Sequence, residues 1–520
     1  MSSNNNFFDI IIVGLGPVGA VLANLLGNYD LSVLVLEKSK EIHPTPRAIH
    51  FDGEVMRVFQ NAGLASKIKN IARPTHKGMH FVGKNNETLL VRKGLEGVGD
   101  QGWENNWYFF QPDLEKTLRA GLLRFSNVTV RLGENVTNIK DSDSKISVST
   151  QVDLSKNECW YEGTWMIGCD GARSIVSKKI PSENDNLGLD EKWLVVDLTI
   201  RDGSIRAAKL PDYTIQHCDP QRPMTRCYIS PLRRRWEIMI LPGDNIESMG
   251  QTKFIWSLLE PWLSPEDADI ERAQIYTFHS LIRKEWKNDH IVLAGDSAHQ
   301  SPPFLGQGLC AGIRDASALA WRLGLILEKK ASEKTINSYV EERKSHVREF
   351  IDLAVKCGKT IKSGDPKLIS KYFQQETGTQ TNVFDFPKPQ LGLGDWVKGV
   401  SPLGQISPQF LSKDGFLSDN YALYKFIMFQ KHDLKRPFSR RHQKIIQNWG
   451  ICIVKATMGV EKWLNLLGAT AALIRPDRYL YGVGNDFEEV AILLEHFECT
   501  MLEGEKTEDY IEEEKDKNLT

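Results

Sequence analysis

The stretch that decides the fold is Asp9-Ile-Ile-Ile-Val-Gly-Leu-Gly-Pro-Val-Gly19, in which a short apolar run leads directly into a glycine-rich turn. An uninterrupted β-branched run of this kind is typical of a parallel strand that is buried on both faces. Small and apolar residues at helical spacing follow over 20–26, and a second apolar run ends at Glu37. The sequence therefore predicts a strand–helix–strand unit that opens a dinucleotide-binding fold.

The glycine turn and the acid that follows it predict a bound dinucleotide. Gly14 permits the tight turn, Gly16 lets the backbone approach a pyrophosphate, and Gly19 lets the helix pack on the strand. The phosphates then meet the helix N-terminus, where Pro17 stands. Glu37 lies eighteen residues after Gly19, close to the spacing expected of an acid that binds ribose hydroxyls. The motif alone does not distinguish FAD from NAD.

Composition excludes several other classes of protein. The 520 residues are enough for roughly two to four domains. A net charge of −2 gives no basic field, so we expect no nucleic-acid partner. The eight cysteines form no CxxC pair, so we expect reduced thiols in the cytoplasm and no metal site. Pro17 and Asn24 interrupt the apolar run 10–26 and the first basic residue is Lys38, so we expect neither a membrane span nor a secretory signal.

Two later blocks follow apolar strands and end in a loop with an acid and a glycine, Asp170-Gly-Ala-Arg-Ser174 and Gly295-Asp-Ser-Ala-His299. In this order, after the glycine turn, they resemble the class A FAD-dependent aromatic hydroxylases. Further blocks are similar to the 3-(3-hydroxyphenyl)propionate hydroxylase-like branch of that family, and the resemblance covers nearly the whole chain. These blocks are 46–57, 110–115, 231–237, 295–323 and 475–479.

The resemblance implies an FAD-dependent monooxygenase that consumes NADH or NADPH as a transient co-substrate. With O2 it would hydroxylate a small phenolic aromatic substrate through a flavin C4a-hydroperoxide. The flavin supplies this chemistry, so no nucleophilic triad is needed. Two alternatives stay open: another flavin enzyme on the same scaffold, such as a halogenase, oxidase or dehydrogenase, or a flavin-binding regulatory protein. We expect a monomer or a homodimer.

The resemblance also implies an α/β fold with three units. A Rossmann-type FAD-binding domain of the glutathione-reductase-like kind is interleaved with a β-sheet substrate domain and followed by a thioredoxin-like domain. A run of like charges repels itself and buries nothing, so we expect the acidic tail to be disordered. The predicted boundaries are 1–75, 103–182 and 280–362 for the FAD-binding domain, 76–102 and 183–279 for the substrate domain, 363–412 for a linker, 413–502 for the thioredoxin-like domain and 503–520 for the tail.

The cofactor site is predicted from the same blocks. An acid at a strand end, such as Asp296, can accept hydrogen bonds from ribityl hydroxyls, and its structural alternative is a cap. By resemblance, Gln111 contacts the flavin, with a surface polar residue as the alternative. Arg47 lies near the pyrophosphate by resemblance, with a solvated loop cation as the alternative. Asp170 and Arg173 border the FAD and nicotinamide approach by resemblance, with a structural turn as the alternative. The predicted cofactor-binding residues are Gly14, Gly16, Pro17, Gly19, Glu37, Lys38, Arg47, Gln111, Asp170, Gly171, Arg173, Gly295, Asp296, Pro303, Gly306, Gly308, Leu309 and Cys310.

Three further features invite a catalytic or binding role. His299 could act as a base, but we expect a structural histidine at the border of the flavin loop. Cys310 has no basic neighbour that would lower its pKa, so we expect it to pack in the helix rather than react. Arg233-Arg-Arg235 could bind an acidic substrate, but alternate residues of a strand face opposite ways, and we expect a solvated face.

Overall fold

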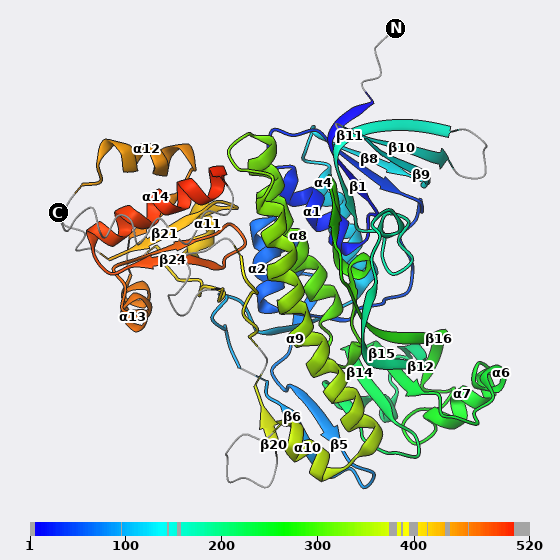
Figure 1. Ribbon diagram of the computed structural model, residues 1–520. Helices are drawn as coiled ribbons and strands as arrows, with labels where there is room; N and C mark the ends of the chain where they lie inside the picture. The colour runs from blue at the N-terminus through cyan, green and yellow to red at the C-terminus, as the bar shows by residue number, and fades with distance from the viewer. Residues whose placement is uncertain are drawn as a thin grey trace.

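The computed structural model describes residues 6–94, 96–142, 145–152, 158–373, 382–385, 388–394, 404–412, 414–431, 437–455 and 457–503. Within these ranges the chain forms two large β-sheets, a small C-terminal sheet and a three-stranded sheet. Two long central helices run between these sheets (Figure 1). The predicted acidic tail lies outside the described residues except for Glu503.

The first large sheet places the glycine turn at an edge that several strand ends share. Strand β1 (Phe7–Val13) pairs in parallel with β2 (Val33–Glu37) and β11 (Glu158–Gly168), and β11 pairs in parallel with β18 (Ile291–Leu293). The carboxyl ends of parallel strands lie at one edge, so the loops after β1, β2, β11 and β18 meet there. The other strands of this sheet are β8 (Val128–Leu132), β9 (Glu134–Ser142), β10 (Lys145–Val152) and β17 (Lys287–Asn288).

Buried helices cover this sheet. Helix α1 (Pro17–Leu26) packs against α8 (Gly308–Leu327) and α4 (Gln111–Leu122). Nearly all of α8 is buried, which its apolar sequence explains. Helix α9 (Thr335–Ser363) continues from this layer down to the second large sheet (Figure 1). The three-stranded sheet of β3 (His50–Asp52), β7 (Asn106–Phe109) and β4 (Ala72–Pro74) lies next to α2 (Gly53–Asn61) and α3 (Ala65–Lys69).

The second large sheet has two distinct faces. Trp236 and Ile238 of its central strand β15 (Arg233–Met239) share an apolar core with Ile255 and Leu259 of α7 (Thr252–Leu259). The alternate residues of β15 face the first domain instead. In order, the strands are β19 (His299–Gln300), β16 (Ala268–Arg283), β12 (Asn184–Ile200), β15, β14 (Met224–Ser230), β13 (Thr214–His217), β5 (Met79–Val82), β6 (Thr88–Arg92) and β20 (Asn382–Phe384). Short helices α5 (Ile205–Ala208) and α6 (Ile246–Met249) lie outside it.

The segment 363–412, which the sequence predicts to be a linker, contains regular structure. Helix α10 (Pro366–Phe373) follows α9, and β20 pairs in parallel with β6 at the end of the second sheet. Ile369 and Phe373 of α10 are buried in the main core, and Phe373 contacts Phe384 of β20. These apolar contacts explain why the segment has structure despite its Gly-, Pro- and Gln-rich composition. Parts of it lie outside the described residues.

The C-terminal unit is a small sheet with helices. Strand β21 (Ile427–Gln430) pairs in parallel with β22 (Cys452–Lys455) and antiparallel with β23 (Ala471–Ile474), and β24 (Leu480–Gly484) extends the sheet. This β–α–β–α–β–β–α order is compatible with a thioredoxin-like unit, which stays a prediction. Its helices are α11 (Ser418–Ala422), α12 (Arg440–Asn448), α13 (Met458–Leu466) and α14 (Phe487–Glu503). None of the helices in the described ranges has both the length and the hydropathy that a membrane crossing requires.

Buried ion pairs attach the C-terminal unit to the rest of the molecule. Asp419 accepts hydrogen bonds from Arg57 of α2 at 2.7 and 2.9 Å and from Arg478 at 2.7 Å. Burial alone would raise the pKa of Asp419, but Arg478 and Arg57 lower it to about 2. This carboxylate therefore stays ionised and pairs with two buried guanidinium groups.

We predict that Asp419→Ala lowers the free energy of unfolding by about 3–5 kcal/mol, because it leaves two buried cations without their anion. Thermal and urea unfolding at pH 7, with limited proteolysis of the C-terminal unit, measure the effect. Asp212→Ala is the control, because it breaks the exposed Lys77–Asp212 pair and should leave the midpoint unchanged. Equal unfolding midpoints for Asp419→Ala and Asp212→Ala would contradict the role of Asp419 as the anion of the buried ion pairs.

Candidate active site

The glycine turn is packed so closely that two of its residues have no room for a side chain. Gly14 has a φ of +100°, and a Cβ there would lie 2.5 Å from the Cys169 carbonyl oxygen. A Cβ on Gly19 would lie 2.0 Å from the carbonyl oxygen of Gly14. Gly16, by contrast, faces open space at the N-terminus of α1. Gly14 and Gly19 thus shape the turn, while Gly16 leaves the helix N-terminus accessible to a ligand.

Glu37 holds the turn from the end of β2. Its Oε2 accepts the Leu15 N–H at 2.8 Å, and its Oε1 accepts the Ser39 N–H at 2.8 Å. Each carboxylate oxygen has a second lone pair, so the half-buried side chain can still accept ligand hydroxyls. Lys38, the next residue, is exposed.

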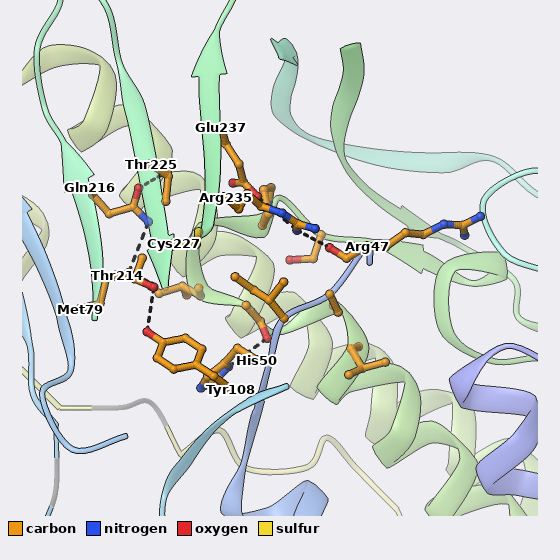
Figure 2. A pocket seen from close by; sticks show the side chains of 18 of the residues that line it. Arg47, His50, Met79, Tyr108, Thr214, Gln216, Thr225, Cys227, Arg235 and Glu237 are labelled. Carbon is orange, nitrogen blue, oxygen red and sulfur yellow. Dashed lines mark hydrogen bonds and ion pairs between the residues drawn. The ribbon is translucent and has the colours of Figure 1, made fainter. Parts of the chain in front are cut away.

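Gln111 positions a loop of the site. Its Oε1 accepts the N–H groups of Arg47 and Ala48 at 2.8 and 2.7 Å, and its Nε2 donates to Glu115 at 2.8 Å. The buried amide therefore orients the loop that contains Arg47. The exposed Arg47 side chain extends away from the second sheet (Figure 2). A flavin contact through Gln111 stays a prediction.

The loop after β11 is organised by Asp170. Its Oδ2 accepts the backbone N–H groups of Ile175 at 2.7 Å and Val176 at 3.3 Å. The structure thus contains the turn that the sequence analysis gave as the alternative role of this acid. Gly171 is half-buried and Arg173 is exposed beside it. Their contacts with a cofactor or with nicotinamide stay predictions.

His299 belongs to a buried ion cluster beneath the loop after β18. Its Nε2 lies 2.7 Å from Asp315 Oδ2, which also accepts the Gly295 N–H at 2.9 Å. Arg343 of α9 donates to Asp315 Oδ1 at 2.8 Å. Burial alone would raise the pKa of Asp315, but His299 and Arg343 lower it to about 2. His299 is absent from the lining of the nearby cavity and supports the loop that contains Asp296.

A cavity of about 200 Å³ lies between this loop and the second sheet. The wall of the cavity on the side of the first large sheet includes the exposed Asp296 carboxylate and the N-terminus of α8. A Cβ on Gly308 would meet nothing within 4 Å, so this helix terminus is open to a ligand. Helix N-termini favour negative charge. The predicted residues that line the cavity are Arg47, Asp296, Pro303, Gly306, Gly308 and Leu309.

Cys310 lies behind this wall. Its thiol is buried and contacts the Gly306 carbonyl oxygen at 3.6 Å, and burial raises its pKa well above the usual value. The group is therefore an unreactive thiol that packs in α8, outside the cavity lining.

The opposite wall belongs to the predicted β-sheet substrate domain, but its individual residues, other than Arg235, were not predicted from the sequence. Figure 2 shows side chains from strands of the second sheet facing Tyr108 and His50 across the cavity. Three strands each contribute residues at positions i and i+2, which is the spacing that brings side chains to one face. This alternation of mostly polar residues was the signal in the sequence that could have predicted the wall. The residues of this wall are Met79, Arg92, Thr214, Gln216, Thr225, Cys227, Arg235 and Glu237, and the residues that face them are His50 and Tyr108.

Hydrogen bonds hold several polar groups of the cavity lining in place. The Tyr108 hydroxyl lies 2.8 Å from Thr214 Oγ1, and the Thr225 hydroxyl donates to the Gln216 side-chain oxygen Oε1. Burial raises the pKa of Tyr108 to about 12, so the phenol is neutral at pH 7. Burial and Arg92 lower the pKa of His50 to about 4, so its ring is neutral as well.

Arg235 corrects the interpretation of the arginine cluster as a solvated face. It is buried, and it donates to Asp197 Oδ1 at 2.7 Å, to the Arg47 carbonyl at 2.8 Å and to the Pro46 carbonyl at 2.5 Å. The prediction was wrong for Arg235 and also for Arg234, which is buried as well. One face of their strand packs on the apolar core under α7, and the other face meets the Pro46 and Arg47 loop. Arg235 therefore holds the loop that contains Arg47.

The geometry fits an extended dinucleotide. The N-termini of α1 at Gly16 and of α8 at Gly308 are both open, and the Glu37 and Asp296 carboxylates are positioned to accept hydroxyl groups. The FAD binding domain family matches residues 8–354. The chain belongs to this family. It is a flavin-dependent enzyme of the aromatic hydroxylase class, as the motifs predict.

Named relatives agree with the family. A protein named probable NADH-specific resorcinol 4-hydroxylase, from Rhodococcus jostii, is 30% identical over 510 residues, which is 93% of each chain. A 3-(3-hydroxy-phenyl)propionate/3-hydroxycinnamic acid hydroxylase from Burkholderia cenocepacia is 33% identical over 68% of this chain and 64% of its own length. The match with this second protein thus spans less than two thirds of its length.

Solved structures share the fold. The flavin-dependent monooxygenase PieE, in complex with FAD and substrate, has a TM-score of 0.80 at 17% identity and covers 94% of this chain and 98% of its own. Aklavinone-11 hydroxylase, in a ternary complex with FAD and aklavinone, has a TM-score of 0.78 at 18% identity and covers 95% and 98%. The mixed α/β architecture predicted from the sequence is confirmed by these matches.

We predict that Gly16→Val and Gly14→Val have different effects. The Gly16 side chain would enter the open space, so this apoprotein should fold normally but bind FAD at least tenfold more weakly. The Gly14 side chain would clash with the Cys169 backbone, so this variant should also lose thermal stability. Calorimetric FAD titration and apoprotein melting measure the two effects. Wild-type FAD affinity in Gly16→Val would refute the cofactor position.

Asp296→Ala and His299→Ala should also differ. Asp296 faces the cavity, so its loss should leave folding intact and weaken FAD binding by roughly 1.5–3 kcal/mol, the value of a hydrogen bond to a charged group. His299→Ala should lower the melting temperature because it breaks the Asp315 cluster, while turnover at saturating FAD stays substantial. A thousandfold rate loss in His299→Ala, with normal FAD binding and one ionisation missing from the pH profile, would identify His299 as a base.

Proposed function

We propose that the chain uses FAD, NADH and O2 to hydroxylate a one-ring phenol in the cavity between the α8 N-terminus and the second sheet. The observation that supports this most directly is the cavity itself, which joins the predicted flavin residues to a polar wall. An apolar cavity of about 150 Å³ binds benzene, so about 200 Å³ suits a single substituted ring. The resorcinol hydroxylase relative, similar over 93% of its length, favours a dihydroxybenzene and NADH.

The chain's own groups would bind and orient the reactants. Bound FAD would supply electron transfer from the nicotinamide nucleotide and the activation of O2. Gly16 and the α1 N-terminus would hold the pyrophosphate, Glu37 the ribose and Asp296 the ribityl hydroxyls. The N-terminus of α8 would stabilise negative charge on the reduced ring system.

The cavity walls would keep water from the reacting centre. Met79, Leu305 and Leu309 are apolar residues of the lining, and the second sheet closes one side with its own apolar core behind it. Excluding water favours transfer of oxygen to the ring over loss of peroxide. A cytoplasmic location and a monomeric or homodimeric state stay predictions.

We predict that resorcinol and related phenols stimulate NADH oxidation by the FAD-loaded protein and that the product gains one oxygen atom. Paired assays with NADH and NADPH, product mass and peroxide yield measure the outcome, with 3-(3-hydroxyphenyl)propionate as a second test substrate. Peroxide equal to the NADH consumed would indicate an oxidase. A halogenated product in the presence of halide would indicate a halogenase. FAD binding without any substrate-dependent oxidation would support a regulatory protein.

A further inference from the structure

We propose that Glu237 is a catalytic residue that accepts the hydroxyl proton of the bound phenol. The inference rests on the proposed function, because it assigns a role toward the substrate of that reaction. In this step the phenolic O–H bond breaks and an O–H bond forms on a Glu237 oxygen. The electron pair stays on the phenolic oxygen, so nothing is oxidised or reduced and the ring becomes more electron-rich.

The register of the second sheet places Glu237 on the substrate side. Its neighbours Trp236 and Ile238 point into the apolar core under α7, so Glu237 points the other way. Thr225 pairs with Glu237 on one side and with Gln216 on the other. These three residues form a polar row across β13, β14 and β15, and all three line the cavity (Figure 2).

Glu237 retains free acceptor capacity. Its one ion-pair contact in the described structure is Arg235 Nη1, which lies 3.7 Å from Glu237 Oε1 and is too distant for a hydrogen bond. Arg235 instead donates to Asp197 and to the Pro46 and Arg47 carbonyls. A buried carboxylate without hydrogen-bond donors is costly, and a phenolic hydroxyl in the cavity would supply one.

Other ionisable groups of the lining suit this role less well. His50 Nε2 lies 3.0 Å from Asn106 Oδ1, which engages this nitrogen. Tyr108 is a neutral phenol already paired with Thr214. Asp296 is a second carboxylate of the lining, but it lies on the wall on the side of the first large sheet, beside the predicted flavin residues. Glu237 is therefore the carboxylate of the lining that would face the phenol from the second sheet.

The groups around Glu237 come from three further elements. Asp197 of β12 and Arg272 of β16 form an ion pair at 2.5 Å, and Cys227 of β14 is a neutral thiol beside Arg235. Two carboxylates thus face two guanidinium groups, a formally neutral cluster. Burial raises the pKa of Glu237 and Asp197 adds to this effect, while Arg235 and Arg272 oppose it. A carboxylate with a raised pKa is closer to the value that suits a general base near neutral pH.

The charge of the buried Glu237 carboxylate also affects the stability of the fold. An acid whose pKa is raised by folding binds its proton more tightly in the folded state, so its ionised form destabilises the fold above its unfolded pKa of about 4.3. Glu237→Gln should therefore melt no lower than wild type at pH 8, and its advantage should vanish as the pH falls below about 4. A carboxylate whose pKa is lowered by folding would show the opposite change.

The test compares Glu237→Gln and Glu237→Asp with Glu271→Gln, an exposed carboxylate of β16 that pairs with Arg233 away from the cavity. For wild type, kcat/KM for resorcinol should fall as the pH drops through the Glu237 pKa. In Glu237→Gln this acid limb should be absent and kcat should fall roughly 10²- to 10⁴-fold, the usual contribution of a general base. Glu237→Asp should keep the limb at a reduced rate, and Glu271→Gln should match wild type.

A second measurement does not depend on turnover. Resorcinol bound to the FAD-loaded wild type should show ultraviolet phenolate absorbance at a pH where free resorcinol is neutral, and Glu237→Gln should lose this signal while it retains FAD. Wild-type hydroxylation with an unchanged Glu237→Gln pH profile and spectrum would overturn the role of Glu237 alone. No phenol-dependent turnover in wild type would instead overturn the proposed function.

Discussion

The arrangement of the site depends on one buried carboxylate, Asp315 of α8. It accepts the Gly295 N–H, contacts His299 Nε2 at 2.7 Å and binds Arg343 of α9, so the loop after β18 and two helices are fixed to one another. The N-terminus of α8 and the Asp296 carboxylate consequently face the cavity in a fixed relation. The His299 ring and the Arg343 guanidinium together lower the pKa of this buried carboxylate, although burial alone would raise it.

The second sheet is joined to the first domain through main-chain groups. Arg235 and Arg272 both donate to the Pro46 carbonyl, while Gln111 binds the Arg47 N–H from the other side. Asp197 pairs with both arginines. Buried guanidinium groups hold this loop on one side and the buried Gln111 amide holds it on the other. The loop cannot shift without leaving buried polar groups unpaired, so the cavity between the two walls keeps its shape.

The sequence predicted the parts of the site that local chain geometry determines. The turn at Gly14 and the acids Glu37 and Asp296 follow strands directly, and parallel strands bring such ends to one edge. The opposite wall depends on pairing between β13, β14 and β15, so Thr225 and Glu237 become neighbours only through long-range register. The same holds for β20, whose pairing with β6 gives structure to a segment with the composition of a linker.

The C-terminal unit is connected to the site through contacts with α2 and α8. Tyr479 donates to Glu54 at 2.8 Å, and Arg314 of α8 donates to both Glu54 and Asp52 at 2.7 and 2.6 Å. Asp52 ends β3, the strand that begins with the cavity residue His50. Trp321, further along α8, donates to Asp477. The C-terminal unit is therefore a structural support of the cavity wall, because loss of its contacts would leave the buried Arg57 of α2 without Asp419 and Glu54 without the Tyr479 hydroxyl.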